Sequence, residues 1–155
     1  MIIMNTLIIF GAKYLFLVGL AFFVVYFFRL PKEQRKTAFI FSLIDLPAVY
    51  LASLIAGYFY NNPRPFVSEH ITPLISHAAD NGFPSDHTLL VAALASILYY
   101  YNRALGFIVF GVALLIGVSR VFAGIHHWID LIGSFAIAIV VTAIVYQLSK
   151  KRLFV

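Results

Sequence analysis

The chain has 155 residues, of which 63% are apolar and only 11% are charged. A soluble domain has roughly one quarter charged residues, so the composition excludes a soluble domain and predicts an integral membrane protein that forms a single domain, residues 1–155. The lack of cysteine excludes disulfides and thiolate metal sites. Because the loops account for the net charge of +5, no nucleic-acid partner is expected.

Five apolar stretches each have roughly the 20 residues that cross a bilayer core. The predicted spans are residues 6–28, 37–60, 85–101, 104–120 and 128–148. The first stretch lacks a basic leader and a small-residue cleavage site, so we expect it to remain in the mature protein. The predicted fold class is an all-α integral membrane protein, a bundle of about five transmembrane helices with its active site at the outer membrane face.

Basic residues predict the orientation of this bundle in the cell membrane. They follow the first span, join the third and fourth spans, and end the chain: Arg29, Lys32, Arg35, Lys36, Arg103, Lys150, Lys151 and Arg152. Because short loops rich in Lys and Arg stay in the cytoplasm, we expect the N-terminus outside and the C-terminus in the cytoplasm. Segments 61–84 and 121–127 would then share the outer face, where all five histidines lie or border.

The segment NPRPFV follows the second span. Pro63 and Pro65 stop helical propagation and place Arg64 in an extended segment at the water boundary. A guanidinium binds two oxygens of a phosphate at once, so Arg64 is a candidate phosphate ligand.

The segment FPSDHT opens the third predicted span. Ser85 is a candidate N-cap, and the free backbone amides of the first helical turn attract an anion. Asp86 also favours a helix N-terminus by its charge alone. His87, in the same turn, is positioned to donate a proton to a leaving oxygen.

The segment SRVFAGIHHWID contains the candidate nucleophile. His126 and Asp130 lie four residues apart and share one helix face, so the carboxylate can hold one ring nitrogen and leave the other to attack. Arg120 ends the preceding helix and can reach the same place. These groups predict a phosphoryl-transfer site that requires no metal. A metal bound by His87, His126 and Asp130 is conceivable, but two arginines would repel it.

Together, RP, PSDH and the spaced SR, H and D resemble the three signature motifs of the type 2 phosphatidic acid phosphatase superfamily. PRPFV, HAADNGFPSDHT and GSF resemble its bacitracin-resistance type of undecaprenyl-diphosphatase, over about residues 45–140. The resemblance implies a phosphatase without cofactors, in which His126 forms a phosphohistidine and Asp130 orients it. It further implies that His87 protonates the leaving group and that three residues hold the phosphate, namely Arg64, Ser85 and Arg120.

The same resemblance favours His77 and Asp80, from HAAD, as walls of the site. Asp86 replaces the glycine of the general superfamily signature, as in the undecaprenyl-diphosphatase pattern. The chain departs from the family where Gly57 occupies the position of a lysine, for which we consider Lys13 a substitute. The family also commonly has six spans, one more than predicted here.

The expected partners are membrane lipids and a polyprenyl diphosphate in the outer leaflet, hydrolysed to undecaprenyl phosphate and inorganic phosphate. Two alternatives stay open. One is a phosphatase of another lipid phosphate, such as phosphatidylglycerophosphate, phosphatidate or a lipid A phosphate. The other is a proton-coupled carrier or lipid-binding protein that uses Asp45, an acid inside the second span, although Asp45 could instead pair with a neighbouring helix.

Overall fold

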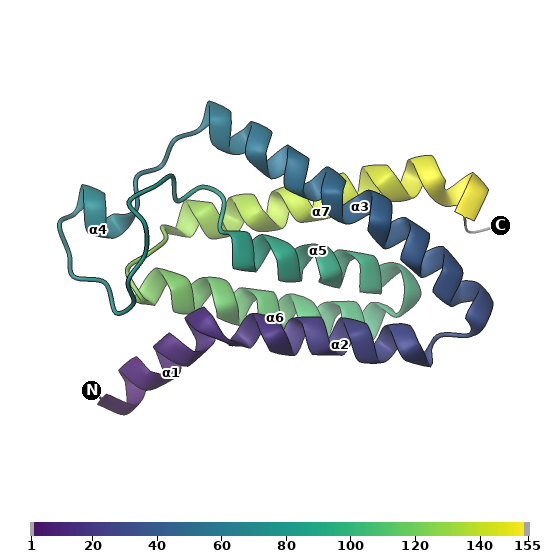
Figure 1. Ribbon diagram of the computed structural model, residues 1–155, viewed down its shortest axis with the longest axis horizontal. Coiled ribbons are helices and arrows are strands. Elements are labelled where there is room, and N and C mark those ends of the chain that lie inside the picture. Colours follow the sequence, from purple (N-terminus) through teal and green to yellow (C-terminus); the bar gives the residue numbers. More distant parts are fainter. Residues whose placement is uncertain (1, 154–155) are drawn as a thin grey trace.

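The computed structural model describes residues 2–153, with side chains through residue 150, and this part of the chain is helical without strands. The helices are α1 (Ile2–Lys13), α2 (Leu15–Arg29), α3 (Lys32–Phe59), α4 (Pro65–Ser68), α5 (Asp86–Tyr101), α6 (Arg103–Phe122) and α7 (Trp128–Leu153) (Figure 1). The all-α fold class is confirmed. Both ends of the predicted domain and the side chains of Lys151 and Arg152 lie outside the described part.

Helix α5 is the centre of the bundle. It packs against α2, α3, α6 and α7, and its residues from Leu89 to Leu98 are buried apart from Leu90 (Figure 1). A helix that is apolar all round is stable only when neighbours surround it. The surrounding helices therefore hold the N-terminus of α5, with the PSDH motif, at one end of the bundle.

Three described helices are long and apolar enough to cross a membrane, namely α3, α6 and α7. The pair α1 and α2 makes a fourth span if it is counted as one bent element. Helix α5 corresponds to the predicted span 85–101, but its 16 residues are fewer than the roughly 20 that cross a bilayer core. The count of five spans therefore stays a prediction.

The predicted first span, residues 6–28, is not one straight helix. Helices α1 and α2 meet at Tyr14 with a bend of 46°. No proline or polar cap marks this position in the sequence, but tertiary contacts meet the backbone just before it. The carbonyl of Ala12 accepts a hydrogen bond from Arg120 of α6 (3.1 Å), and the backbone at Gly11 lies close to the Ser119 side chain.

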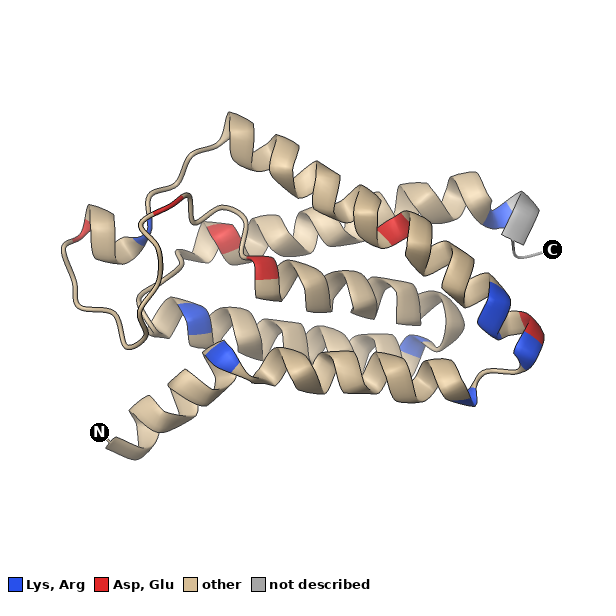
Figure 2. Ribbon diagram, viewed as in Figure 1, with Lys and Arg blue, Asp and Glu red and all other residues tan. Residues whose placement is uncertain are grey.

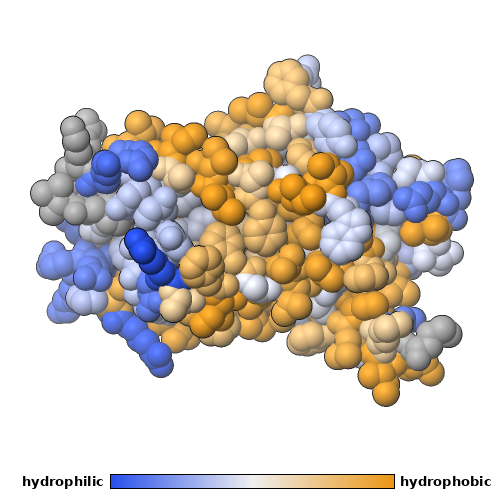
Figure 3. Space-filling view, turned by 180° about the vertical axis from the view of Figure 1, so that it is seen from behind, coloured by the Kyte–Doolittle hydropathy of each residue, from blue (hydrophilic) through white to orange (hydrophobic). Residues whose placement is uncertain are grey.

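Charged and apolar residues are segregated along the bundle. Figure 2 shows basic residues in the turn between α2 and α3, in the turn between α5 and α6, and near the end of α7, all at one end. The loops after α3 and α6 lie at the other end (Figure 1). Between the two ends, the face in Figure 3 is covered mostly by apolar residues. This band is the surface that lipid tails would contact.

Buried Asp45 joins two of the long helices. Its Oδ2 accepts a hydrogen bond from the Thr142 hydroxyl of α7 (3.1 Å), and neither residue is exposed to solvent. The expected pairing of Asp45 with a polar group of a neighbouring helix is confirmed. A hydrogen bond between membrane helices accounts for this acid without a carrier function.

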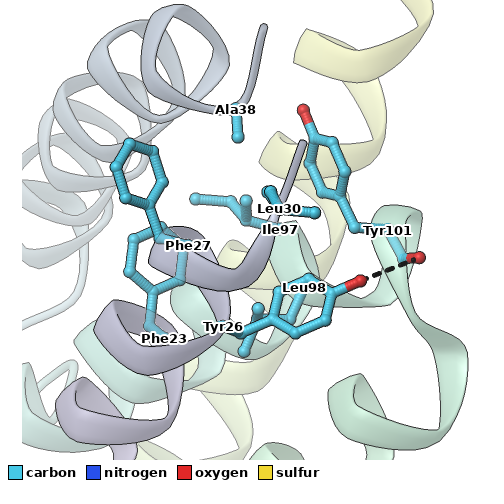
Figure 4. Close-up of a pocket in the computed structure, with 8 residues that line it drawn as sticks. All are labelled: Phe23, Tyr26, Phe27, Leu30, Ala38, Ile97, Leu98 and Tyr101. Carbon is cyan, nitrogen blue, oxygen red and sulfur yellow. Dashed lines mark hydrogen bonds between the residues drawn. The ribbon is translucent and has the colours of Figure 1, made fainter. Parts of the chain in front are cut away.

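At the basic end of the bundle, α2, α3 and α5 enclose a small apolar cavity (Figure 4). The Tyr26 hydroxyl donates to the carbonyl of Tyr101 at its edge (3.3 Å). The cavity volume of about 10 Å³ is no more than one water molecule needs. We interpret it as a packing gap and not as a ligand site.

Close packing at the turn between α5 and α6 provides a test of the fold. A Cβ atom at Gly106 would lie 2.7 Å from the Cα of Tyr99, and this backbone cannot move cheaply. We expect Gly106→Ala to lower the free energy of unfolding by about 1–3 kcal/mol. The matched control is Gly111→Ala, because nothing lies within 4 Å of a Cβ there; it should be neutral or stabilising by up to about 1 kcal/mol. Thermal unfolding in one detergent measures both, and equal midpoints would contradict the packing.

Candidate active site

The imidazole of His126 lies at the centre of a buried polar cluster, between the end of α6 and the start of α7. Only 2% of the residue is exposed. Its Nδ1 lies 3.2 Å from Oδ2 of Asp130, and its Nε2 lies 3.1 Å from Nη1 of Arg64 and 3.2 Å from Nη2 of Arg120. Guanidinium nitrogens only donate, so Nε2 must accept and the ring proton must lie on Nδ1. This tautomer leaves the Nε2 lone pair directed at both arginines.

The two arginines reach His126 from distant parts of the chain, and both are at least nine-tenths buried. Arg64 is held by Asp80 (Nε to Oδ1, 2.7 Å) and by the carbonyl of Ile125 (Nη1 to O, 2.9 Å). Arg120 donates to the carbonyl of Ala12, and its Nε has no hydrogen-bond partner among the described residues. Two buried cations at one nitrogen make a strong anion site, because burial reduces screening by water.

Charge and burial together act on the proton affinity of His126. Burial lowers its pKa, and the charges of Arg120 and Arg64 lower it further against the raising effect of the hydrogen bond to Asp130, so that the pKa falls to about 4. A folded-state pKa below the ordinary value of about 6.5 means that the neutral ring persists to lower pH. The ring is therefore unprotonated at neutral pH, as a nucleophile must be.

Asp130 is fully buried and accepts hydrogen bonds from three groups. Besides His126, its Oδ2 accepts from the backbone N–H of His127 (2.9 Å), and its Oδ1 accepts from Nδ2 of Asn62 (2.7 Å). A buried carboxylate is tolerated only when such donors surround it. The predicted i,i+4 pair of His126 and Asp130 is thus present, although α7 begins at Trp128, after the histidine.

His77 and Asp80 both lie at the edge of the cluster. The ring centroid of His77 lies 6.3 Å from that of His126, and its Nδ1 is 3.9 Å from Oδ1 of Asp80. Burial lowers the pKa of His77, and the charge of Arg64 lowers it further. Burial raises the pKa of Asp80, but the hydrogen bond and charge of Arg64 outweigh this effect and hold it below its ordinary value. Asp80 is therefore an anion that positions Arg64.

The N-terminus of α5 differs in part from its predicted geometry. Ser85 occupies the N-cap position, but its side chain makes no capping bond; the hydroxyl lies 3.1 Å from Thr88 Oγ1 instead. Its backbone N–H donates to the Ser134 hydroxyl (2.9 Å), which ties α5 to α7. Ser85 is buried, so its hydroxyl lies close to the helix and not in solvent.

The other two predicted residues of this turn do not join the His126 cluster by hydrogen bonds. Asp86 is exposed and has neither a hydrogen bond nor an ion pair within residues 2–150. The His87 ring packs edge-on against Phe16 of α2, with centroids 4.9 Å apart. The predicted roles of both residues, like those of the whole site, stay predictions.

Two asparagines that sequence reasoning missed hold the outer loops in place. Asn62 bonds Asp130, as described above. The Asn81 amide donates to the carbonyls of Gly57 and Tyr60 (2.9 and 3.0 Å), and its Oδ1 accepts from the backbone N–H of Asn62 and of Phe83 (2.9 and 3.0 Å). The sequence feature that could have indicated them is their position beside the motifs: Asn62 lies in NNPRP and Asn81 lies in DNGFP.

Gly57, which stands where the family has a lysine, is packed closely against a loop. A Cβ atom at Gly57 would lie 3.0 Å from the carbonyl oxygen of Phe83, so the loop lies against α3 where a longer side chain would begin. Lys13 ends α1, next to Ala12, whose carbonyl binds Arg120. It is exposed and makes no hydrogen bond or ion pair in the described residues, so its role as a substitute stays a hypothesis.

Within the described part of the chain, no three His, Asp or Glu side chains are arranged to hold a metal ion. The donors around His126 are mainly cationic or amide groups, which suit an anion. The arrangement can therefore bind a tetrahedral oxyanion and attack it with an imidazole.

Residues 37–154 match the family described as PAP2 superfamily. The chain belongs to the PAP2 superfamily. This membership was predicted from the three motifs and is confirmed. The motif residues Arg64, Ser85, Arg120, His126 and Asp130 all fall inside the matched range.

Two known proteins are similar to this chain in sequence, and a solved structure is similar to it in fold. Over 105 residues, the chain is 38% identical to undecaprenyl-diphosphatase BcrC of Bacillus subtilis. The aligned segment covers 64% of this chain and 53% of that protein. It is 27% identical over 96 residues to phosphatidylglycerophosphatase B of the same species, covering 55% and 47%. The matched segments thus span about half the length of these two relatives. The crystal structure of Aquifex aeolicus LpxE superposes with a TM-score of 0.66 at 24% identity, over 94% of this chain and 84% of that one.

The lowered pKa of His126 can be tested directly. We expect the imidazole to titrate at about pH 4, because burial and two arginines disfavour its protonated form. Histidine-labelled protein in detergent would be titrated by NMR, with His126→Gln used to assign the resonance. The exposed His70 serves as an internal comparison. A His126 midpoint near 6.5, the ordinary value, would contradict the electrostatic description of the site.

Proposed function

We propose that the protein is a lipid phosphatase that hydrolyses undecaprenyl diphosphate to undecaprenyl phosphate and inorganic phosphate. One observation carries the proposal: the Nε2 lone pair of His126 faces two buried arginines, Arg64 and Arg120. A nucleophile and two cations within hydrogen-bond distance of each other suit phosphoryl transfer, which depends mainly on alignment and on neutralising oxygen charge.

In the proposed reaction, Nε2 of His126 attacks the terminal phosphorus while the bond to the bridging oxygen breaks. Arg64 and Arg120 bind the oxygens of the transferring group, and the first-turn amides of α5 add partial positive charge. His87 protonates the leaving undecaprenyl phosphate. Water then attacks the phosphohistidine, releases inorganic phosphate and regenerates the imidazole.

Asp130 supports both steps by accepting the Nδ1 hydrogen bond of His126. Phosphorylation of Nε2 makes the ring cationic, and a neighbouring carboxylate stabilises that charge. Asp80 plays a different part, because its bond to Nε of Arg64 fixes the direction of the guanidinium. In this scheme, neither the attack by His126 nor the hydrolysis of the phosphohistidine needs a metal ion.

The choice of substrate rests on sequence similarity to a relative and on the side of the membrane that the site is proposed to face. BcrC of Bacillus subtilis is named an undecaprenyl-diphosphatase. The basic residues at the end of the bundle opposite His126 favour a cytoplasmic position for that end (Figure 2). This pattern supports the proposal that the site and the N-terminus face outside. A polyprenyl diphosphate in the outer leaflet of the cell membrane would present its diphosphate there, for recycling of the carrier lipid in cell-wall synthesis.

A second candidate is a phosphatase of phosphatidylglycerophosphate, because a phosphatidylglycerophosphatase is also among the relatives. Both substrates present a terminal phosphate to the same cluster. The difference lies in the leaving group, which is a lipid phosphate in one case and an alcohol in the other.

Trapping tests the covalent step. Brief incubation with substrate labelled at its terminal phosphate, followed by denaturation in alkali, should leave acid-labile label on the native protein. His126→Ala should carry no label and lose at least about 10³-fold in turnover, since the nucleophile is gone. Excess chelator should change neither result. Label that persists in His126→Ala would overturn the assignment of the nucleophile.

Comparison of substrates tests the lipid class. We expect kcat/KM for undecaprenyl diphosphate to exceed that for phosphatidylglycerophosphate and phosphatidate by about 10-fold or more, which corresponds to about 1.4 kcal/mol of transition-state binding. Phosphate release in mixed micelles at equal surface concentration measures all three. Equal or reversed values would favour the second candidate.

A further inference from the structure

A chain of polar contacts reaches His126 from the water side. Oε1 of Glu69, at the end of α4, lies 3.4 Å from Nε2 of His127. Nδ1 of His127 lies 3.1 Å from Nδ2 of Asn62, and the same amide nitrogen lies 2.7 Å from Oδ1 of Asp130. Asp130 in turn holds His126. No role has been assigned above to Glu69 or His127, and the side chain of Asn62 has been described only as a partner of Asp130.

Elementary donor and acceptor rules fix the direction of the two hydrogen bonds that the Asn62 amide makes. A carboxylate only accepts, so the Asn62 atom that faces Asp130 must be the amide nitrogen. Its second hydrogen points to Nδ1 of His127, which therefore accepts. The ring proton of His127 then lies on Nε2, where it faces Glu69. One tautomer of His127 thus satisfies both of its neighbours.

Asn62 supplies the hydrogen-bond donor for Oδ1 of Asp130. Oδ2 of Asp130 is shared by the His126 ring and the His127 backbone, whereas Oδ1 has Asn62 as its only hydrogen-bond partner within the described chain. Asp130 is 0% exposed, so water cannot easily replace this donor. Without the amide, the carboxylate would rotate or take up a proton, and either change weakens its bond to His126.

We propose that Asn62 is a positioning residue of the phosphatase site, which acts through Asp130 to direct the Nε2 lone pair of His126 at the transferring phosphate. His127 and Glu69 hold the Asn62 amide in the required rotamer. The inference rests on the proposed nucleophilic role of His126. Asn62 need not touch the substrate in this role, so its loss should affect turnover more than substrate binding.

The importance of the members decreases with distance from His126. The side chain of Glu69 is 57% exposed and that of His127 is 27% exposed, so water competes for their contact. Asn62 lies beneath them and contacts the buried carboxylate directly. We therefore expect a large effect from Asn62, an intermediate effect from His127 and a small effect from Glu69.

The first experiment removes the amide. Outer hydrogen bonds that orient a functional histidine are worth about 10–100-fold, so Asn62→Ala should lower kcat by that factor with KM nearly unchanged. The matched control is Asn61→Ala, because Asn61 is adjacent, exposed and without a hydrogen bond in residues 2–150. Activity would be measured with the lipid phosphate that the native protein hydrolyses fastest, so the result does not depend on the identity of the natural substrate.

The second experiment distinguishes positioning from a general loss of structure. Asn62→Asp keeps the shape but sets two carboxylates against each other, which must share a proton to coexist. As pH falls from 8 to 5, the shared proton replaces the lost N–H, so the activity of Asn62→Asp relative to the native protein should rise at least about 10-fold. The relative activity of Asn62→Ala should stay flat, because alanine offers no donor at any pH.

The outcomes separate the two proposals. If His126→Ala is inactive while Asn62→Ala is within twofold of native, the positioning role is wrong and the phosphatase mechanism stands. If Asn62→Ala is impaired but Asn62→Asp shows no recovery at low pH, the effect is structural and the positioning role is also wrong. If His126→Ala keeps native activity, the proposed mechanism fails first.

Discussion

The architecture of the site depends on one constraint, the burial of the Asp130 carboxylate. A charge removed from water costs several kcal/mol unless donors surround it, and three donors do so here. They come from segments far apart in the chain: Asn62 after α3, and His126 and His127 between α6 and α7. Satisfying one carboxylate therefore brings the outer loops together.

The same convergence fixes the charges around His126. Arg64 follows Asn62 by two residues and enters the cluster because the loop is already held there. Its guanidinium then spans Asp80, the carbonyl of Ile125 and the His126 ring. Arg120 arrives from the other side on the buried face of α6, held by the Ala12 carbonyl. The anion site is thus assembled by hydrogen bonds that also close the bundle.

Hydropathy and motif spacing predicted the all-α fold and most helix positions, because long apolar runs leave few alternatives in a membrane. The run 104–120 corresponds to α6 and 128–148 to α7 with errors of a few residues. The bend at Tyr14 was not predicted, since no proline marks it and the contacts beside it join α1 to α6, which is distant in the chain. The motifs predicted Arg64, Arg120 and His126 because guanidinium and imidazole groups are typical of phosphoryl transfer. An asparagine carries no such signal, so the hydrogen bond of Asn62 to Asp130 was missed.

The length of α5 bears on how deep the proposed site would lie in a membrane. At 1.5 Å per residue, its 16 residues span about 24 Å, against about 30 Å for the hydrocarbon core. If its basic end lies at the cytoplasmic boundary, Ser85 sits several ångströms beneath the opposite one. A headgroup must then sink toward the tails to meet the imidazole, and the loops above it must let in one water molecule for each turnover. In that arrangement a short central helix would keep the proposed hydrolysis beneath the membrane surface, away from phosphates dissolved outside.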